Sequence, residues 1–167
     1  MKIPINYSIE TGAWLHCRTE ERSWEWGSME SVAIDFRVRV VSFGKIEIME
    51  IDDPNKIELP LESGNLWLLE VNVVNLTKKE IESFPINSSL ILVDQDDFEF
   101  IPTSDRHLTT SEYGMSKGLN LLNGWSGSDC GIFMPKIAVR GSLAFLLPDE
   151  DDALYSLSVR NGSIQEI

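Results

Sequence analysis

Residue types that carry acid–base and nucleophilic chemistry are scarce in this chain. Its histidines and cysteines are His16, His107, Cys17 and Cys130. The segment 124–131 reads Gly-Trp-Ser-Gly-Ser-Asp-Cys-Gly and is superficially similar to nucleophile loops, yet it lacks their Gly-x-Ser-x-Gly spacing and strand-to-helix elbow. A hydrolase with Ser126 or Cys130 as nucleophile and His107 as base is therefore only an alternative. The pattern favours a turn-rich loop, and we expect no catalytic residues.

An acidic run is the best candidate for metal chemistry. Residues 94–99 read Asp-Gln-Asp-Asp-Phe-Glu, and carboxylate oxygens are ligands that Ca²⁺ prefers. Asp94, Asp96 and Asp97 are the candidate ligands. The run lacks the central glycine and the distant glutamate of an EF-hand loop, so a solvated β-turn is the favoured interpretation. We expect no cofactor, with calcium as the alternative.

Tryptophan is abundant, with five in the chain. The first thirty residues bring together aromatic and basic side chains, namely Trp14, Trp24, Trp26, Arg18 and Arg22. Aromatic residues and arginine are enriched in binding hot spots. Trp24 and Trp26 share one face of a strand at a spacing of two, so core packing competes with exposure as their role. Trp125 lies between Gly124 and Ser126 in a predicted loop, which favours exposure.

The charge balance narrows the classes of partner. The chain has 14 Lys and Arg against 27 Asp and Glu, so its formal net charge is −13. Such a surface repels phosphate backbones and anionic lipid, and we therefore expect neither nucleic acid nor a membrane as partner. The first residues show no signal peptide and no segment is apolar enough to span a bilayer, which predicts a cytoplasmic protein, or an extracellular or periplasmic one if a leader was removed. The two distant cysteines predict free thiols, with one bridge as the alternative.

Alternating apolar residues predict β-strands along most of the chain. In 31–43, Val32, Ile34, Phe36, Val38 and Val40 alternate with more polar positions. The same period-two pattern occurs in 66–75 and 136–147, and Gly141 predicts a bulge or a close backbone approach. Residues 90–93 and 98–101 should pair across a four-residue acidic hairpin loop. Tyr155, Leu157 and Val159 complete the set of strands.

Helical periodicity is weak, with short turns expected at 78–83 and 116–122. Six or more strands without alternating helices predict an all-β, immunoglobulin-like sandwich of two antiparallel sheets. The whole chain, 1–167, fits a single domain of ordinary size. Residues 1–30 form an N-terminal extension expected to pack on the sandwich, and 103–135 form an irregular insertion loop.

The order of segments resembles a known family. Residues 66–81 read Leu-Trp-Leu-Leu-Glu-Val-Asn-Val-Val-Asn-Leu-Thr-Lys-Lys-Glu-Ile, a hydrophobic strand followed by Asn and a polar turn. With the segments at 90–100, 136–148 and 154–159, this sequence resembles the DUF4352 family of immunoglobulin-like domains over roughly residues 32–160. The resemblance implies a β-sandwich of largely unassigned function, common in prokaryotic exported proteins and lipoproteins. It transfers no catalytic residues.

These observations predict a non-enzymatic binding or interaction domain. The strand pattern supplies a scaffold, catalytic residue types are few, and aromatic-rich segments supply contact surface. The expected partner is another protein or a second copy of the chain, and a dimer would follow from a self-complementary apolar patch.

Overall fold

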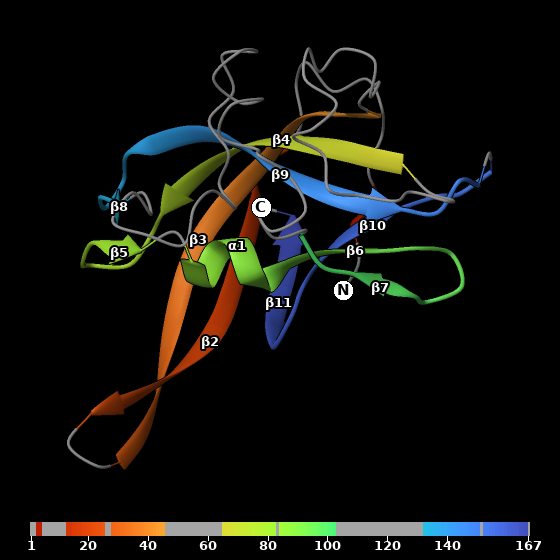
Figure 1. Cartoon of the computed structure of the whole chain (residues 1–167). Coiled ribbons are helices and arrows are strands. Elements are labelled where there is room, and N and C mark those ends of the chain that lie inside the picture. The colour runs from red at the N-terminus through yellow and green to blue at the C-terminus, as the bar shows by residue number, and fades with distance from the viewer. Residues whose placement is uncertain are drawn as a thin grey trace, which may run out of the picture.

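The computed structural model describes residues 3–4, 13–25, 28–45, 65–82, 84–102, 132–150 and 152–166. These residues form eleven strands and one short helix (Figure 1). They are β1 (Ile3–Pro4), β2 (Leu15–Glu25), β3 (Ser28–Lys45), β4 (Asn65–Asn75), β5 (Ile81–Glu82), α1 (Phe84–Ser89), β6 (Leu90–Val93), β7 (Glu99–Phe100), β8 (Ile132–Phe133), β9 (Ala138–Leu147), β10 (Ser156–Val159) and β11 (Gly162–Glu166).

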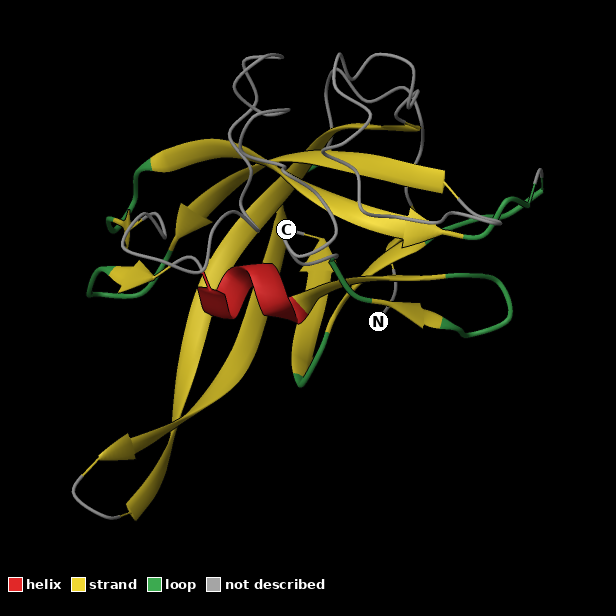
Figure 2. Ribbon diagram, in the orientation of Figure 1, coloured by secondary structure: helices red, strands yellow, loops and turns green. Residues whose placement is uncertain are grey.

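The strands form two main antiparallel sheets, as Figure 2 shows in yellow. The larger sheet has the order β11-β2-β3-β4-β9, and the smaller has the order β1-β10-β6-β7. A further two-stranded pair joins β5 to β8. The prediction of an all-β sandwich of two packed antiparallel sheets is confirmed. Among the described residues, no helix is long and apolar enough to cross a bilayer.

Both sheets contribute side chains to one hydrophobic core. Leu15, Cys17 and Phe36 come from the larger sheet, while Leu92 and Leu157 come from the smaller sheet, and all five are buried in the same cluster. Burial of such apolar surface is worth about 25 cal/mol per Å², which makes this interior the main stabilising feature of the domain.

Strand β3 follows its predicted alternation only in part. Ile34, Phe36, Val38 and Val40 are buried, whereas Val32 is 49% exposed, so its expected place in the core is wrong. The pairing of β3 with β4 shifts between Val40 and Ser42, which marks a β-bulge. The extra residue restores the inward direction for Phe43, three positions after Val40.

The bulge predicted at Gly141 is absent, because β4 and β9 pair without a shift from Asn65 to Val74 and Gly141 lies opposite Val71. The alternative, a close backbone approach at Gly141, stays a prediction. A close approach that the sequence did not indicate occurs at another glycine, Gly162. A Cβ atom at Gly162 would lie 1.8 Å from the carbonyl oxygen of Arg18. Gly162 begins β11 directly after the two residues that connect it to β10, where the chain passes from the smaller sheet to the larger. The corner therefore needs a residue without a side chain.

The short turn expected at 78–83 is also misplaced, because the helix lies at Phe84–Ser89. Pro85 suits the first turn of a helix, where its missing N–H is not needed, and Ile86 anchors the turn by complete burial. The turn predicted at 116–122 and nearly all of the 103–135 insertion lie outside the described residues. Of the segment 1–30, expected as an extension packed on the sandwich, residues 15–25 instead form β2, a strand inside the larger sheet between β11 and β3. The predicted pairing of 90–93 with 98–101 is confirmed by the antiparallel contact of β6 with β7.

Candidate functional site

The outer face of β2 and β3 gathers basic and aromatic side chains. From Leu15 to Thr19 and from Ile34 to Val40, every second residue points into the core, so the intervening residues face away from the smaller sheet. We call this surface the Arg–Trp face. It consists of Trp14, His16, Arg18, Asp35, Arg37 and Arg39.

Strand register places Trp14 beside two arginines. Leu15, the first residue of β2, pairs with Val38. Trp14 directly precedes Leu15 and therefore reaches Arg37 and Arg39, which flank Val38 on β3. The guanidinium carbon of Arg37 lies 4.8 Å from the centroid of the Trp14 ring, and that of Arg39 lies 4.9 Å from it. Each contact is a cation–π interaction, worth about 0.5–1 kcal/mol at a partly exposed site. All three side chains are half-buried, which orders them before any partner arrives.

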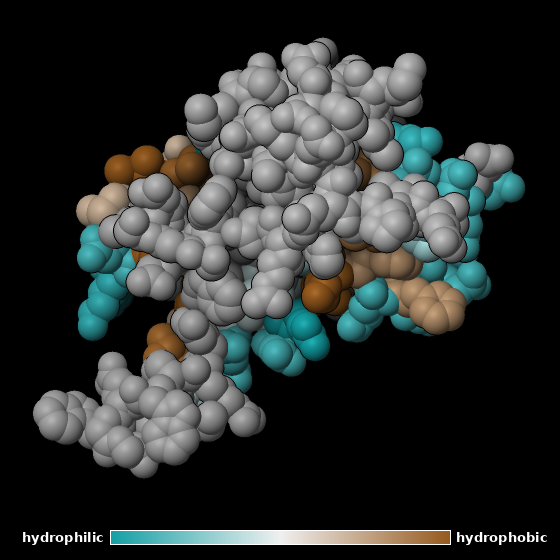
Figure 3. All heavy atoms as spheres, in the orientation of Figure 1, coloured by the Kyte–Doolittle hydropathy of each residue, from teal (hydrophilic) through white to brown (hydrophobic). Residues whose placement is uncertain are grey.

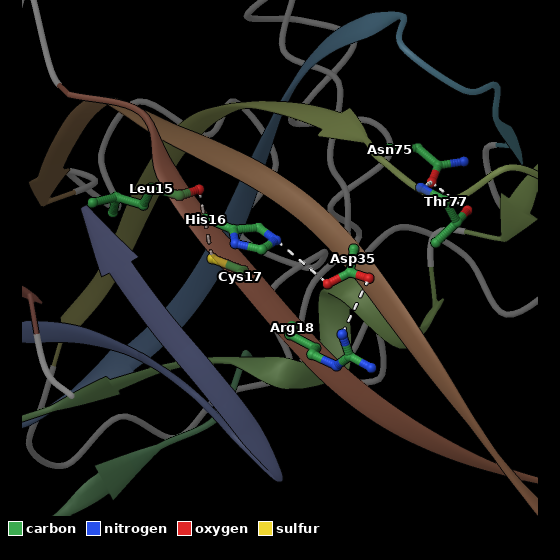
Figure 4. A network of polar contacts seen from close by, with 7 residues as sticks. All are labelled: Leu15, His16, Cys17, Arg18, Asp35, Asn75 and Thr77. Carbon is green, nitrogen blue, oxygen red and sulfur yellow. Dashed lines mark hydrogen bonds and ion pairs between the residues drawn. The ribbon is translucent and has the colours of Figure 1, made fainter. Parts of the chain in front are cut away.

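Asp35 neutralises the neighbouring part of the face. Arg18 pairs with Asp35 across the strands, and its Nη1 lies 3.6 Å from Asp35 Oδ2 (Figure 4). His16 Nε2 lies 3.3 Å from Asp35 Oδ1. Asp35 Oδ1 is buried and accepts no hydrogen bond, so His16 Nε2 lies close to it without the alignment that a hydrogen bond needs. One carboxylate thus serves two basic side chains.

Arg37 and Arg39 form no comparable ion pair with any carboxylate of the described residues. The ion pairs in that part of the chain join His16 and Arg18 to Asp35, and Arg140 to Glu70. Arg37 Nε is buried and has no hydrogen-bond acceptor. An unsatisfied buried donor costs about 1–3 kcal/mol, and more when it is charged. A planar guanidinium presents a fork of donors that matches a carboxylate. This pair of arginines is therefore ready to receive acidic groups.

A second ion pair lies on the same side of the larger sheet, over β4 and β9. Arg140 Nε donates to Glu70 Oε1 at 2.6 Å, and Ser42 Oγ donates to Glu70 Oε2 at 3.0 Å. The hydrogen bond from Arg140 is the largest of the effects that hold the pKa of Glu70 below its ordinary value. Glu70 in turn raises the pKa of Arg140 through the same bond. These charges are already matched, so they do not extend the receptive part of the Arg–Trp face.

Asn75 fixes the end of β4 next to this face. It is fully buried, and its Nδ2 donates to Lys79 O at 2.8 Å and to Phe133 O at 2.9 Å. Its Oδ1 accepts from the backbone N of Thr77 at 2.8 Å (Figure 4). The next residue, Leu76, donates its backbone N–H to Asp35 O at 2.9 Å. The backbone of the candidate site is thereby tied to a rigid, hydrogen-bonded corner.

The predicted tryptophan site is only partly described. The backbone of Trp24 belongs to β2 and pairs with Met29, while its side chain lies outside the described residues. Trp26 and Trp125 also lie outside them. Binding by Trp24, Trp26 and Trp125 stays a prediction. The structure instead places Trp14 in contact with arginines, and these are Arg37 and Arg39 of the next strand.

The sequence did not indicate Arg37 and Arg39 as binding residues, because the alternation in β3 shows only that they lie on its solvent-facing side. The signal that could have found them is the pattern Arg-Val-Arg at 37–39 next to a tryptophan-bearing strand. It becomes informative only when the register of β2 against β3 is known.

The three aspartates of the predicted calcium site have a structural role in the β6–β7 hairpin. Asp94 Oδ1 accepts hydrogen bonds from the backbone N of Asp96 and of Phe98, both at 2.9 Å. Asp97 has a φ of 68°, in the left-handed region that aspartate tolerates. Asp96 and Asp97 point into solvent. Among the described residues, no group of three or more His, Cys, Asp or Glu side chains is arranged to hold a metal ion. Calcium binding here stays a prediction.

The proposed nucleophiles and base of a hydrolase, Ser126, Cys130 and His107, lie outside the described residues. The described cysteine is a free thiol in the core. Burial raises the pKa of Cys17 to about 12, so its reactive thiolate is absent near neutral pH.

No protein-family model, curated protein or solved structure matches the chain. The function must therefore be argued from the Arg–Trp face and the fold that carries it.

Proposed function

We propose that this chain is a non-enzymatic interaction domain that binds an acidic segment of a protein through the Arg–Trp face. The observation that carries the proposal is the contact of Trp14 with both Arg37 and Arg39. The arrangement joins a large aromatic surface to two guanidinium groups that have no described carboxylate. Tryptophan and arginine together are the side chains most enriched where binding energy concentrates.

The net charge of −13 does not prevent such binding. At physiological salt the Debye length is about 8 Å, so distant carboxylates are largely screened while adjacent arginines act at full strength. The overall charge slows the approach of an acidic partner but leaves its contacts at the face intact. A short acidic segment with apolar residues fits this balance best, because it adds few charges and uses the Trp14 ring.

Nucleic acid fits the face less well. Duplex DNA carries one charge per about 1.7 Å of its axis, so any extended phosphate backbone would also meet the acidic remainder of the surface. The spacing of carboxylates in a protein segment is sparser and can be matched to two arginines.

We further propose that the fold is an immunoglobulin-like domain related to the DUF4352 family. The support is the hydrophobic strand that ends in Asn and a polar turn. In the structure, β4 ends at Asn75, and the side chain of this residue organises the turn through Thr77 and Lys79. An Asn at this position is thus required by the fold, which explains why it can mark a family.

The binding test uses the full chain and a fluorescein-labelled decapeptide of glycine and serine that carries three acidic residues around one central phenylalanine. We expect Arg39→Glu to weaken the affinity by about tenfold or more in fluorescence anisotropy, since a close charge reversal costs more than 1.4 kcal/mol. Lys45→Glu is the matched control, because it makes the same charge change at an exposed residue six positions further along β3, beyond the bulge. Equal losses in the two variants, or no binding by the wild type, would contradict the proposal.

Two further probes sharpen the test. Arg39→Lys keeps the charge but removes the planar fork, so it should retain only part of the affinity. A ten-residue oligothymidine labelled in the same way should bind more weakly than the acidic peptide. Equal or tighter binding of the oligonucleotide would assign the face to nucleic acid instead.

A further inference from the structure

We infer that the acidic segment recognised by the Arg–Trp face is the β6–β7 hairpin of a second copy of this chain. The inference rests on the proposed function and names the partner that the surface of the domain itself supplies. It makes the protein a self-associating module.

The β6–β7 hairpin presents an exposed apolar and acidic tip. Phe98 is 66% exposed, Ile101 is 57% exposed, and Leu154 of the neighbouring segment is 68% exposed. The backbone N of Leu154 donates to Gln95 Oε1 at 3.0 Å, which holds the two segments together. We call this surface the hairpin tip. It consists of Gln95, Asp96, Phe98, Glu99, Ile101 and Leu154. Figure 3 shows tan and teal atoms interleaved at the right of the view, where Figure 1 places this hairpin.

The tip combines large apolar side chains with acidic ones. Aromatic and aliphatic residues rimmed by polar groups are typical of a protein interface. Phe98 is exposed, and the nearby residues Asp96 and Glu99 carry exposed carboxylates. The tip therefore has the composition of the acidic, aromatic segment that the Arg–Trp face would take.

The tip is held in shape before binding. Asp94 is buried and closes the loop through its two bonds to backbone amides. Behind the tip, the rings of Phe100 and Tyr155 meet edge to face at 5.9 Å between centroids, and Tyr155 is buried. Such a loop loses little conformational entropy on docking, which favours affinity.

The charges and shapes of the two surfaces are complementary. Arg37 and Arg39 supply two guanidinium groups without a described carboxylate, and the tip supplies the exposed carboxylates of Asp96 and Glu99. Phe98 can stack on Trp14 or on a guanidinium plane, both of which are favourable aromatic contacts. The buried Arg37 Nε would gain an acceptor if the Trp14 ring shifts on binding.

The contact must form between two molecules. The hairpin belongs to the smaller sheet, whereas the Arg–Trp face points away from that sheet on the outer side of the larger one. A hairpin of the same chain therefore lies across the core from its own Arg–Trp face. Two different surfaces in contact produce a reciprocal dimer, a closed ring or an extending chain.

The test is sedimentation velocity of the full chain over a wide range of concentrations. Wild type should associate reversibly. Arg39→Glu damages the face and Asp96→Lys damages the tip, and each should weaken association by about tenfold or more. An equimolar mixture of the two variants should associate again, because each contact then joins opposite charges. Lys45→Glu and Glu80→Lys, at exposed sites outside both surfaces, should behave as wild type.

The outcomes separate this inference from the proposed function. A wild-type chain that remains monomeric throughout overturns the inference, and if that monomer still binds the acidic decapeptide through Arg39 the proposed function stands. Association that Arg39→Glu leaves unchanged, or a mixture of the variants that fails to associate while each remains folded by circular dichroism, also overturns it. Loss of both association and peptide binding in Arg39→Glu, with recovery in the mixture, supports both.

Discussion

The side-chain amide of Asn75 donates a hydrogen bond to the backbone carbonyl of Phe133, 58 residues further along the chain, at 2.9 Å. This bond joins the end of β4 to β8 in the interior. The same amide group also holds the turn that follows β4, through Lys79 O. One side chain therefore connects three backbone segments that local sequence alone would leave apart.

Asn75→Ala should be among the most destabilising single substitutions. It leaves the buried carbonyl of Phe133 and the amide of Thr77 without their partner, and each orphaned group costs about 1–3 kcal/mol. The carbonyl of Lys79 loses one donor but keeps Thr77 Oγ1 at 2.9 Å. We expect a loss of about 3 kcal/mol in the free energy of unfolding, measured with urea. Asn72→Ala, on the outward side of the same strand, should change it by less than about 0.5 kcal/mol. Similar losses in both variants would show that Asn75 is not the connection described.

Gly162→Ala tests the corner between the two sheets. The new methyl carbon would lie 1.8 Å from Arg18 O, a backbone atom that can move only with β2. We expect a loss of about 2 kcal/mol or more in unfolding free energy. Gly44→Ala is the matched control, because nothing lies within 4 Å of a Cβ at Gly44. Its effect should stay within about 0.5 kcal/mol, and the idea fails if the two variants are equally stable.

The buried thiol of Cys17 should make stability fall at alkaline pH. Its pKa rises from 9.0 to about 12 on folding because burial disfavours the thiolate. Between those pH values the unfolded chain loses the proton while the folded chain keeps it, so stability decreases by about 1.4 kcal/mol per pH unit. Urea unfolding of wild type and Cys17→Ala from pH 7 to 11 checks this. The difference between them should be constant up to about pH 8 and change above pH 9, whereas parallel curves throughout would contradict it.

Removing Arg140 should return the pKa of Glu70 toward its ordinary value. The hydrogen bond from Arg140 is the main reason that this pKa is lowered on folding. A lowered carboxyl pKa contributes stability above the ordinary value of 4.5, and this contribution disappears as the pH falls through the folded value. A carbon-detected NMR titration of the Glu70 carboxyl in wild type and Arg140→Ala measures the change. Arg160→Ala, which removes an exposed arginine elsewhere, should leave the titration unchanged.

The sequence predicted the fold well because alternation directly records which side chains are buried. Ile34, Phe36 and Val38 have the expected inward direction, and two antiparallel sheets follow from such strands. The position of the bulge was missed because Gly141 is a stronger local signal than the three-residue step from Val40 to Phe43. The helix was misplaced because Asn75 Nδ2 donates to Lys79 O, four residues further on, and this side-chain hydrogen bond holds the start of the predicted segment in a turn.

The candidate site was harder to predict, because it depends on register. The sequence groups Trp14 with its neighbours Arg18 and Arg22, but its partners in the structure are Arg37 and Arg39. Pairing of Leu15 with Val38 brings them together, and a shift of one residue would turn every side chain of β2 to the other face. Composition can indicate that an aromatic and basic surface exists, whereas only the pairing shows which residues form it.

The most direct test of the central claim is to follow the arginine Nε–Hε and tryptophan indole N–H signals of the full chain by NMR while the acidic decapeptide is added. The proposed function predicts that the signals of Arg37, Arg39 and Trp14 shift first and saturate together, with Arg140 unchanged because Glu70 already holds it. Saturable shifts confined to other arginines and tryptophans, with these three unmoved, would contradict the claim that this face is where the partner binds.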